Sequence, residues 1–127
     1  MDKRLEHFPN LVTMFLTRAR EKGEAPFLWK KTAGQWVSIS WSQAARQVAA
    51  LASALKKFGF KPGDRIMLVS ENRPEWLIAD LGIMAAGCVT VPTYTTNTTR
   101  DHQHILNNSE ARGVIVSTQK LAKPLLP

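Results

Sequence analysis

Hydrophobic and polar residues between positions 63 and 94 follow one another in blocks. A polar turn at 63–64 precedes an apolar run at 65–70, and Gly87 separates a longer apolar run at 76–86 from a short one at 88–91. The two short runs have the length of buried strands, and the longer run has the length of a helix packed on more than one side. This order predicts a β-α-β unit, which joins parallel strands through a helix.

The first third of the chain predicts a helix followed by a hairpin. Asn10 is suited to cap a helix that ends at Gly23, because its side chain can accept a bond from a free backbone amide. The apolar side of that helix is expected to carry Leu11, Met14, Phe15 and Leu16. The runs 27–31 and 35–39 flank Thr-Ala-Gly, a sequence typical of a tight turn between antiparallel strands.

A second helix is predicted to begin at Ser40 and Gln43, which have the spacing of a capping box. It ends at Gly59, and its inward face is expected to carry Ala45, Val48, Ala52 and Leu55. Further along, Ser70 or Asn72 is expected to cap the helix at 76–86, and Pro74 suits the first turn of that helix.

The last third of the chain continues the alternation of strands and helices. A helix is predicted near 100–107, a strand at 113–117 and the start of another helix at 118–126. Because helices fill the intervals between the later strands, the sheet should be parallel. The predicted fold class is α/β: a partial parallel sheet of β-α-β units with helices on its faces, preceded by a helix and a β-hairpin.

Charge is concentrated in the first half of the chain. The net charge is +7, and residues 1–64 carry 11 basic and 5 acidic side chains. A basic surface can attract nucleic acid, anionic lipid or phosphorylated ligands, but most charged surfaces are only solvated. The lysines at 30–31 show no interleaved aromatic residues along the sequence, and those at 56, 57 and 61 form another small cluster, so specific nucleic-acid binding is not indicated.

Other composition signals indicate a cytoplasmic protein. Cys88 is the single cysteine, which excludes an intrachain disulfide, and its apolar neighbours predict a buried, unreactive thiol. The first ten residues are charged and lack the apolar core of a signal peptide. The apolar run 76–92 contains Asp80 and is too short for a transmembrane helix, so no transmembrane segment is expected.

Several passages resemble one enzyme family in their order and spacing. They are SISWSQ at 38–43, GFKPGDR at 59–65, ENRPEW at 71–76, AAGCVTVPTY at 85–94 and HILNNSEA at 104–111. Together they resemble the N-terminal portion of AMP-forming acyl-CoA synthetases, in the adenylate-forming ligase superfamily. The segment VPTYTT at 91–96 is most similar to the long-chain fatty acid branch of that family.

The resemblance implies a reaction that uses ATP, Mg²⁺ and coenzyme A. Such enzymes activate a fatty acid as an acyl-adenylate and then transfer the acyl group to the coenzyme A thiol. The family's Ser/Thr/Gly-rich phosphate loop, its adenine-binding segment, its ribose-binding aspartate and its C-terminal lysine have no counterpart in this sequence. We therefore expect 1–127 to be an N-terminal fragment of the large N-terminal domain, an incomplete part of a larger domain without catalytic or metal-binding residues. Alone it should be inactive and bind no cofactor.

Four residues are candidates for coenzyme A contacts by position in the family. Tyr94 and Thr95 fall where relatives line the channel for the pantetheine arm, although a tyrosine at a strand end also serves packing. Lys120 and Lys123 fall where some relatives carry arginines that contact the coenzyme phosphate, although two such lysines can simply be solvated.

Two histidines are the remaining candidates for metal ligands. His102 and His104 are two positions apart, which puts them on different faces of a helix, so they are expected to be surface residues without a metal.

Two other functional classes remain open from the sequence. One is a stand-alone α/β module that binds a small ligand or a protein, and the other is a basic domain that binds nucleic acid or lipid. If the chain is a fragment, its strand edges would be unpaired, and self-association through them is expected.

Overall fold

The computed structural model describes residues 6–126. The chain divides into two compact units, residues 1–47 and 48–127, and each is described by itself. The first unit holds α1 (Leu11–Lys22), β1 (Pro26–Thr32), β2 (Gln35–Ser40) and the start of α2 (Trp41–Lys57). The second unit holds the rest of α2 and all later elements.

Helix α1 begins and ends where the sequence predicts. The Asn10 side chain accepts a 2.8 Å hydrogen bond from the Thr13 amide, and the Gly23 amide donates to the Ala19 carbonyl. The predicted apolar side is partly wrong. Phe15 and Ala19, four residues apart, are buried, whereas the side chains of Leu11, Met14 and Leu16 remain exposed.

Strands β1 and β2 pair antiparallel through the two-residue turn Ala33-Gly34. Both turn residues have positive φ, 50° and 79°, as the type I′ turn of a right-twisted hairpin requires. A register shift near Phe27 accompanies its packing against the rings of Phe15 and Trp41, at centroid distances of 5.6 Å and 3.9 Å. The predicted hairpin is therefore confirmed.

The predicted capping box at the start of α2 is confirmed. The Gln43 amide donates to the Ser40 hydroxyl at 3.1 Å, and the Ser40 amide donates to Gln43 Oε1 at 2.9 Å. The predicted inward face is displaced by one residue at its start, because Ala44 is fully buried and Ala45 is not. Val48, Ala52 and Leu55 are buried as expected.

The second unit is built on a three-stranded parallel sheet in the order β4-β3-β5. These strands are β3 (Arg65–Val69), β4 (Val89–Thr93) and β5 (Gly113–Val116). Residues 66–69 of the central strand are all buried. Pro92 is accommodated because β4 is an edge strand in this sheet. The expected α/β class with parallel strands is confirmed.

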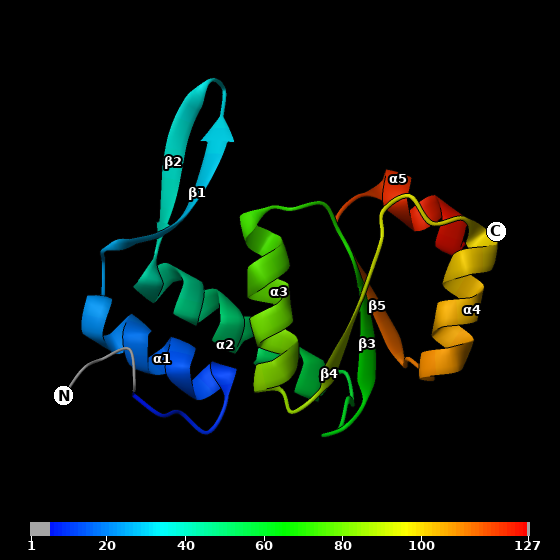
Figure 1. Ribbon diagram of the computed structural model, residues 1–127, viewed down its shortest axis with the longest axis horizontal. Coiled ribbons are helices and arrows are strands. Elements are labelled where there is room, and N and C mark those ends of the chain that lie inside the picture. Colours follow the sequence, from blue (N-terminus) through cyan, green and yellow to red (C-terminus); the bar gives the residue numbers. More distant parts are fainter. Residues whose placement is uncertain (1–5, 127) are drawn as a thin grey trace. The chain divides into compact units, whose positions relative to one another are not determined.

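Helices lie on both faces of this sheet, with α3 (Pro74–Ala85) on one face and α4 (Thr99–Ser109) on the other (Figure 1). The chain continues beyond β5 into the short helices α5 (Gln119–Ala122) and η2 (Lys123–Leu125). Pro74 opens α3 as predicted, but neither predicted cap is correct. Arg73 occupies the cap position without a side-chain bond, and the Ser70 hydroxyl donates to the Glu71 carbonyl instead.

The core of the second unit lies between α2, α3 and the sheet. Its buried members are Ala52, Leu55, Ile66, Ile83, Ala86 and Cys88. The predicted burial of the Cys88 thiol is confirmed, and desolvation raises its pKa. A Cβ atom on Gly82 would lie 2.5 Å from Leu51 Cδ2, so glycine permits the close approach of α3 to α2.

One histidine contradicts the sequence expectation. His102 is 2% exposed, whereas His104 is exposed as predicted. The Nδ1 atom of His102 is buried, and among the described residues it has no hydrogen-bond partner. The polar character of histidine suggested a surface position, but position 102 lies on the face of α4 that is turned inward.

Candidate functional site

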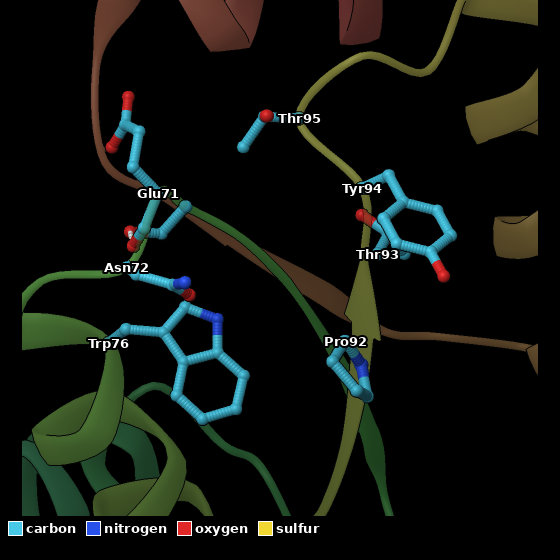
Figure 2. Close-up of a pocket in the computed structure, with 8 residues that line it drawn as sticks. Glu71, Asn72, Trp76, Pro92, Thr93, Tyr94 and Thr95 are labelled. Carbon is cyan, nitrogen blue, oxygen red and sulfur yellow. Dashed lines mark hydrogen bonds between the residues drawn. The ribbon is translucent and has the colours of Figure 1, made fainter.

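A pocket of about 670 Å³ lies where β3 and β4 end. The carboxyl ends of parallel strands are the usual ligand-binding edge of an open α/β sheet. The pocket is lined by residues that follow β3, begin α3 or end β4 (Figure 2): Ser70, Glu71, Asn72, Trp76, Pro92, Thr93, Tyr94 and Thr95.

Tyr94 and Thr95, two of the four sequence candidates, line this pocket. Both follow directly from β4, and the Tyr94 side chain is 79% exposed. In Figure 2 the side chains of Thr95 and Trp76 extend into the space between the strand ends, while the ring of Tyr94 is directed away from Trp76. The lining thus combines aromatic surface, hydroxyl groups, the amide of Asn72 and the carboxylate of Glu71.

A fixed carboxylate stands at the rim of the pocket. Glu71 Oε2 accepts a 2.7 Å hydrogen bond from the Ser117 hydroxyl and lies 3.8 Å from Arg73 Nη1. The bond from Ser117 lowers the pKa of Glu71, with a smaller contribution from a backbone bond, so the side chain is anionic at neutral pH. Arg73 also bonds to Glu75 at 3.0 Å. A phosphate would be repelled by Glu71, whereas a neutral segment of a ligand would not be.

The other two sequence candidates lie apart from this pocket. Lys120 is in α5 and Lys123 begins η2, both are exposed, and neither lines the pocket. Their segment follows β5, so it starts from the same edge of the sheet as Tyr94. Among the described residues, the side-chain ammonium groups of these two lysines form no hydrogen bond or ion pair.

Sequence reasoning missed Trp76, Asn72 and the bond between Ser117 and Glu71. Ser70, Glu71 and Asn72 follow β3, and Ser117 follows β5. Polar residues directly after successive apolar strands were the available signal, since parallel strands end at one edge.

Two negative findings apply to residues 6–126. No group of three or more His, Cys, Asp or Glu side chains is arranged to hold a metal ion within this range. No helix in the described part of the chain is long and apolar enough to cross a membrane.

Residues 15–126 match the sequence profile described as AMP-binding enzyme. This chain belongs to the AMP-binding enzyme family. The resemblance inferred from the sequence motifs is therefore confirmed. The pocket at the carboxyl ends of the strands lies within the matched residues.

Similar proteins of the AMP-binding family are ligases of fatty acids and related acids. The chain is 33% identical over 113 residues to long-chain-fatty-acid–CoA ligase FadD15 of Mycobacterium tuberculosis, covering 89% of the chain and 19% of that protein. It is 34% identical over 107 residues to human long-chain-fatty-acid–CoA ligase 1, covering 83% of the chain and 14% of that protein.

Solved structures of the AMP-binding family agree with the fold. A fatty acid AMP ligase from Legionella pneumophila matches 97% of the chain with a TM-score of 0.84 and 25% identity, over 22% of its own length. A benzoate CoA ligase from Burkholderia xenovorans LB400 matches 93% with a TM-score of 0.82 and 26% identity, over 23% of its length. The chain thus spans between 14% and 23% of the length of these relatives.

Proposed function

We propose that this chain is the N-terminal part of an AMP-forming long-chain fatty acid–CoA ligase. The observation that carries the proposal is the match to named long-chain-fatty-acid–CoA ligases over 83–89% of the chain. In the whole protein, a fatty acid carboxylate attacks the α-phosphorus of ATP and releases pyrophosphate. The coenzyme A thiol then attacks the acyl carbonyl, and AMP leaves.

The chemical difficulty in the first step is the approach of two anions. Mg²⁺ and cationic or backbone N–H groups stabilise the charge that develops on the phosphate oxygens. Glu71 would oppose phosphate binding at the pocket described above, so we assign the pocket to a neutral part of a ligand. The sequence, moreover, contains no Gly-rich phosphate loop.

We assign the pocket to the pantetheine arm of coenzyme A. That arm is a thin chain with two amides and a terminal thiol, and it fits a lining that consists, apart from the Glu71 carboxylate, of hydroxyl, amide and aromatic groups. Tyr94 and Thr95 are the proposed contacts. Lys120 and Lys123, in the segment after β5, are the proposed partners of the coenzyme phosphates, where an exposed ammonium acts as a point charge.

We further propose that the chain alone does not form acyl-adenylate and acts in the cytoplasm as part of a longer protein. The outer edges of β4 and β5 carry no neighbouring strand among the described residues. Unpaired edges favour self-association of the isolated chain. Light scattering should show oligomers that increase with concentration, and a monomer at every concentration would contradict this point.

The reading frame beyond Pro127 tests the main proposal. A protein that joins this chain to the product of that reading frame should convert palmitate, ATP and coenzyme A into palmitoyl-CoA, AMP and pyrophosphate. Tyr94→Ala should raise KM for coenzyme A while the rate of acyl-adenylate formation is unchanged, and Phe58→Ala, at an 82% exposed residue outside the pocket, should change neither. No pyrophosphate release with any fatty acid would refute the ligase.

Thermal shift of the isolated chain separates the alternatives. No shift with nucleotide, coenzyme A or polyanion is expected for the ligase fragment. A large shift with nucleotide or coenzyme A would indicate a stand-alone module, and a salt-sensitive shift with nucleic acid would indicate a basic binding domain.

A further inference from the structure

The end of the β1–β2 hairpin exposes large apolar side chains on both of its faces. Trp36 and Val37 are 66% and 52% exposed, and Trp29 is 55% exposed. Trp36 and Val37 are neighbours on β2, so their side chains point to opposite faces of the ribbon. The apolar surface therefore surrounds the end of the hairpin, which Figure 1 shows as the long cyan ribbon of β1 and β2.

Lysines lie directly across from two of these apolar residues, Trp36 and Val37. Lys31 pairs with Trp36 and Lys30 pairs with Val37 in the antiparallel register, so each lysine shares a face with an exposed apolar side chain. A lysine stem can lie along apolar surface while its ammonium group extends to a more polar layer. No Asp or Glu occurs between Glu24 and Asp64. The hairpin's own sequence therefore contains apolar and cationic residues but no carboxylate.

The register corrects one sequence expectation. Along the chain, the lysines at 30–31 show no interleaved aromatic residues, but pairing of the strands places Lys31 between two tryptophans. Trp29 and Lys31 are two positions apart on β1 and so share a face, and Trp36 lies opposite Lys31 on that same face. On this face of the hairpin, a lysine lies next to aromatic side chains from both strands. The sequence of one strand alone does not show this arrangement.

We propose that the hairpin tip, residues 29–37, docks onto an anionic lipid surface. Tryptophan and lysine both favour the boundary between headgroups and acyl chains, and each lysine near an anionic leaflet adds attraction. The turn Ala33-Gly34 is small and uncharged. Trp36 lies two residues beyond it, roughly 7 Å along a strand. An amphipathic segment enters the boundary region to a depth of roughly 5–10 Å.

The same residues fit lipid better than a nucleic acid. Single-stranded nucleic acid is held by flat aromatic faces on which bases stack, together with a basic groove. Val37 has no such face, and a half-exposed branched aliphatic side chain beside the turn gains most from contact with acyl chains. The proposal depends on the hairpin alone, so it holds whether or not the longer protein is a ligase.

Vesicle binding tests the proposal with the purified chain. Vesicles of phosphatidylcholine alone are compared with vesicles that also contain phosphatidylglycerol, by co-sedimentation and by quenching of tryptophan fluorescence with brominated phosphatidylcholine. Binding to the mixed vesicles with quenching is expected, and it should weaken with salt. Trp36→Ser/Val37→Ser should reduce the affinity on the order of tenfold, and Lys31→Glu by about the same factor.

Matched variants make the outcome decisive. Phe58→Ser removes an 82% exposed aromatic side chain outside the hairpin, and Lys57→Glu makes the same charge change as Lys31→Glu at another exposed site. Both should bind within about twofold of the parent chain, and circular dichroism should match for all variants. The proposal is overturned by equal losses for Lys57→Glu and Lys31→Glu, by binding without quenching, by no vesicle binding, or by tighter binding of a single-stranded oligonucleotide through Trp36.

Discussion

The Ser117 hydroxyl donates a 2.7 Å hydrogen bond to the Glu71 carboxylate, across 46 positions of sequence. Ser117 follows β5 and Glu71 follows β3, and the Ser117 amide also donates to the Val69 carbonyl at 3.1 Å. Side chain and backbone of one serine therefore tie the ends of two neighbouring strands together. This tie fixes the carboxylate at the rim of the pocket.

The bond predicts a dependence of stability on pH. The pKa of Glu71 is lowered from its ordinary value of 4.5, chiefly by Ser117. The folded state therefore binds the proton more weakly than the unfolded state, so the stabilisation is complete above pH 4.5 and is lost as the pH falls through the lowered pKa. Ser117→Ala should return the pKa toward 4.5, as measured by NMR titration of the Glu71 carboxylate.

Thermal unfolding below and above this pH range provides the control. Glu71→Gln should lose less stability on acidification than the parent chain does. Adding Ser117→Ala to Glu71→Gln should change the pH dependence no further, because the titrating partner is already absent. If the double variant differs from Glu71→Gln in how its stability depends on pH, Ser117 must act through another titrating group.

Gly82→Ala should destabilise the chain although alanine favours helix. The gain in helix propensity is about 1 kcal/mol. The new Cβ would lie 2.5 Å from Leu51 Cδ2 and 3.0 Å from Leu51 Cβ, so the whole side chain must move, which costs about 1–3 kcal/mol. Urea unfolding measures the difference. With Leu51→Ala present, Gly82→Ala should become neutral or stabilising, and greater stability of Gly82→Ala by itself would contradict the close approach.

His102→Leu should stabilise the chain. The Nδ1 atom is buried without a partner among the described residues, and an unsatisfied buried polar atom costs about 1–3 kcal/mol. Leucine fills a similar volume without that cost. His104→Leu, at an exposed position of the same helix, is the matched control and should change the unfolding free energy by less than about 0.5 kcal/mol. A loss of stability in His102→Leu would point to a hydrogen bond at this histidine.

Ala33→Asn should stabilise the hairpin. Ala33 has φ of 50°, a left-handed conformation that costs a residue with a Cβ about 1–2 kcal/mol and that asparagine tolerates better. Asn-Gly is also the preferred pair for a type I′ turn. Gly34→Ala should have the opposite effect, by about 1 kcal/mol, because φ is 79° although nothing lies within 4 Å of the new Cβ. Amide exchange of β1 and β2 would report both changes.

Part of the candidate site could be predicted from the sequence, but most of its lining could not. Tyr94 and Thr95, which were chosen by their position in the resembled family, line the pocket. Lys120 and Lys123, chosen by the same positional argument, do not line it. The contributions of Trp76 and Ser117 depend on the packing of α3 and β5 beside β3, which the run of residues does not encode.

The sequence by itself determined the elements whose bonds close within a few residues. Asn10 caps α1 and Ser40 caps α2 through partners three positions away, and residues at that separation lie within about 10 Å of each other even in an extended chain. Glycine marked the end of α1 in the same local way. The β-α-β order followed from the lengths of the apolar runs, and the parallel sheet followed from that order.

Tertiary structure decided what depends on distant partners. The strand order β4-β3-β5, the burial of His102 and the bond from Ser117 to Glu71 each require elements tens of residues apart to pack in one particular way. Loop-closure entropy opposes such contacts, and only the burial of the shared core offsets it. The entropy cost and the gain from burial depend on several segments at once, so these features cannot be deduced from any one segment of the sequence.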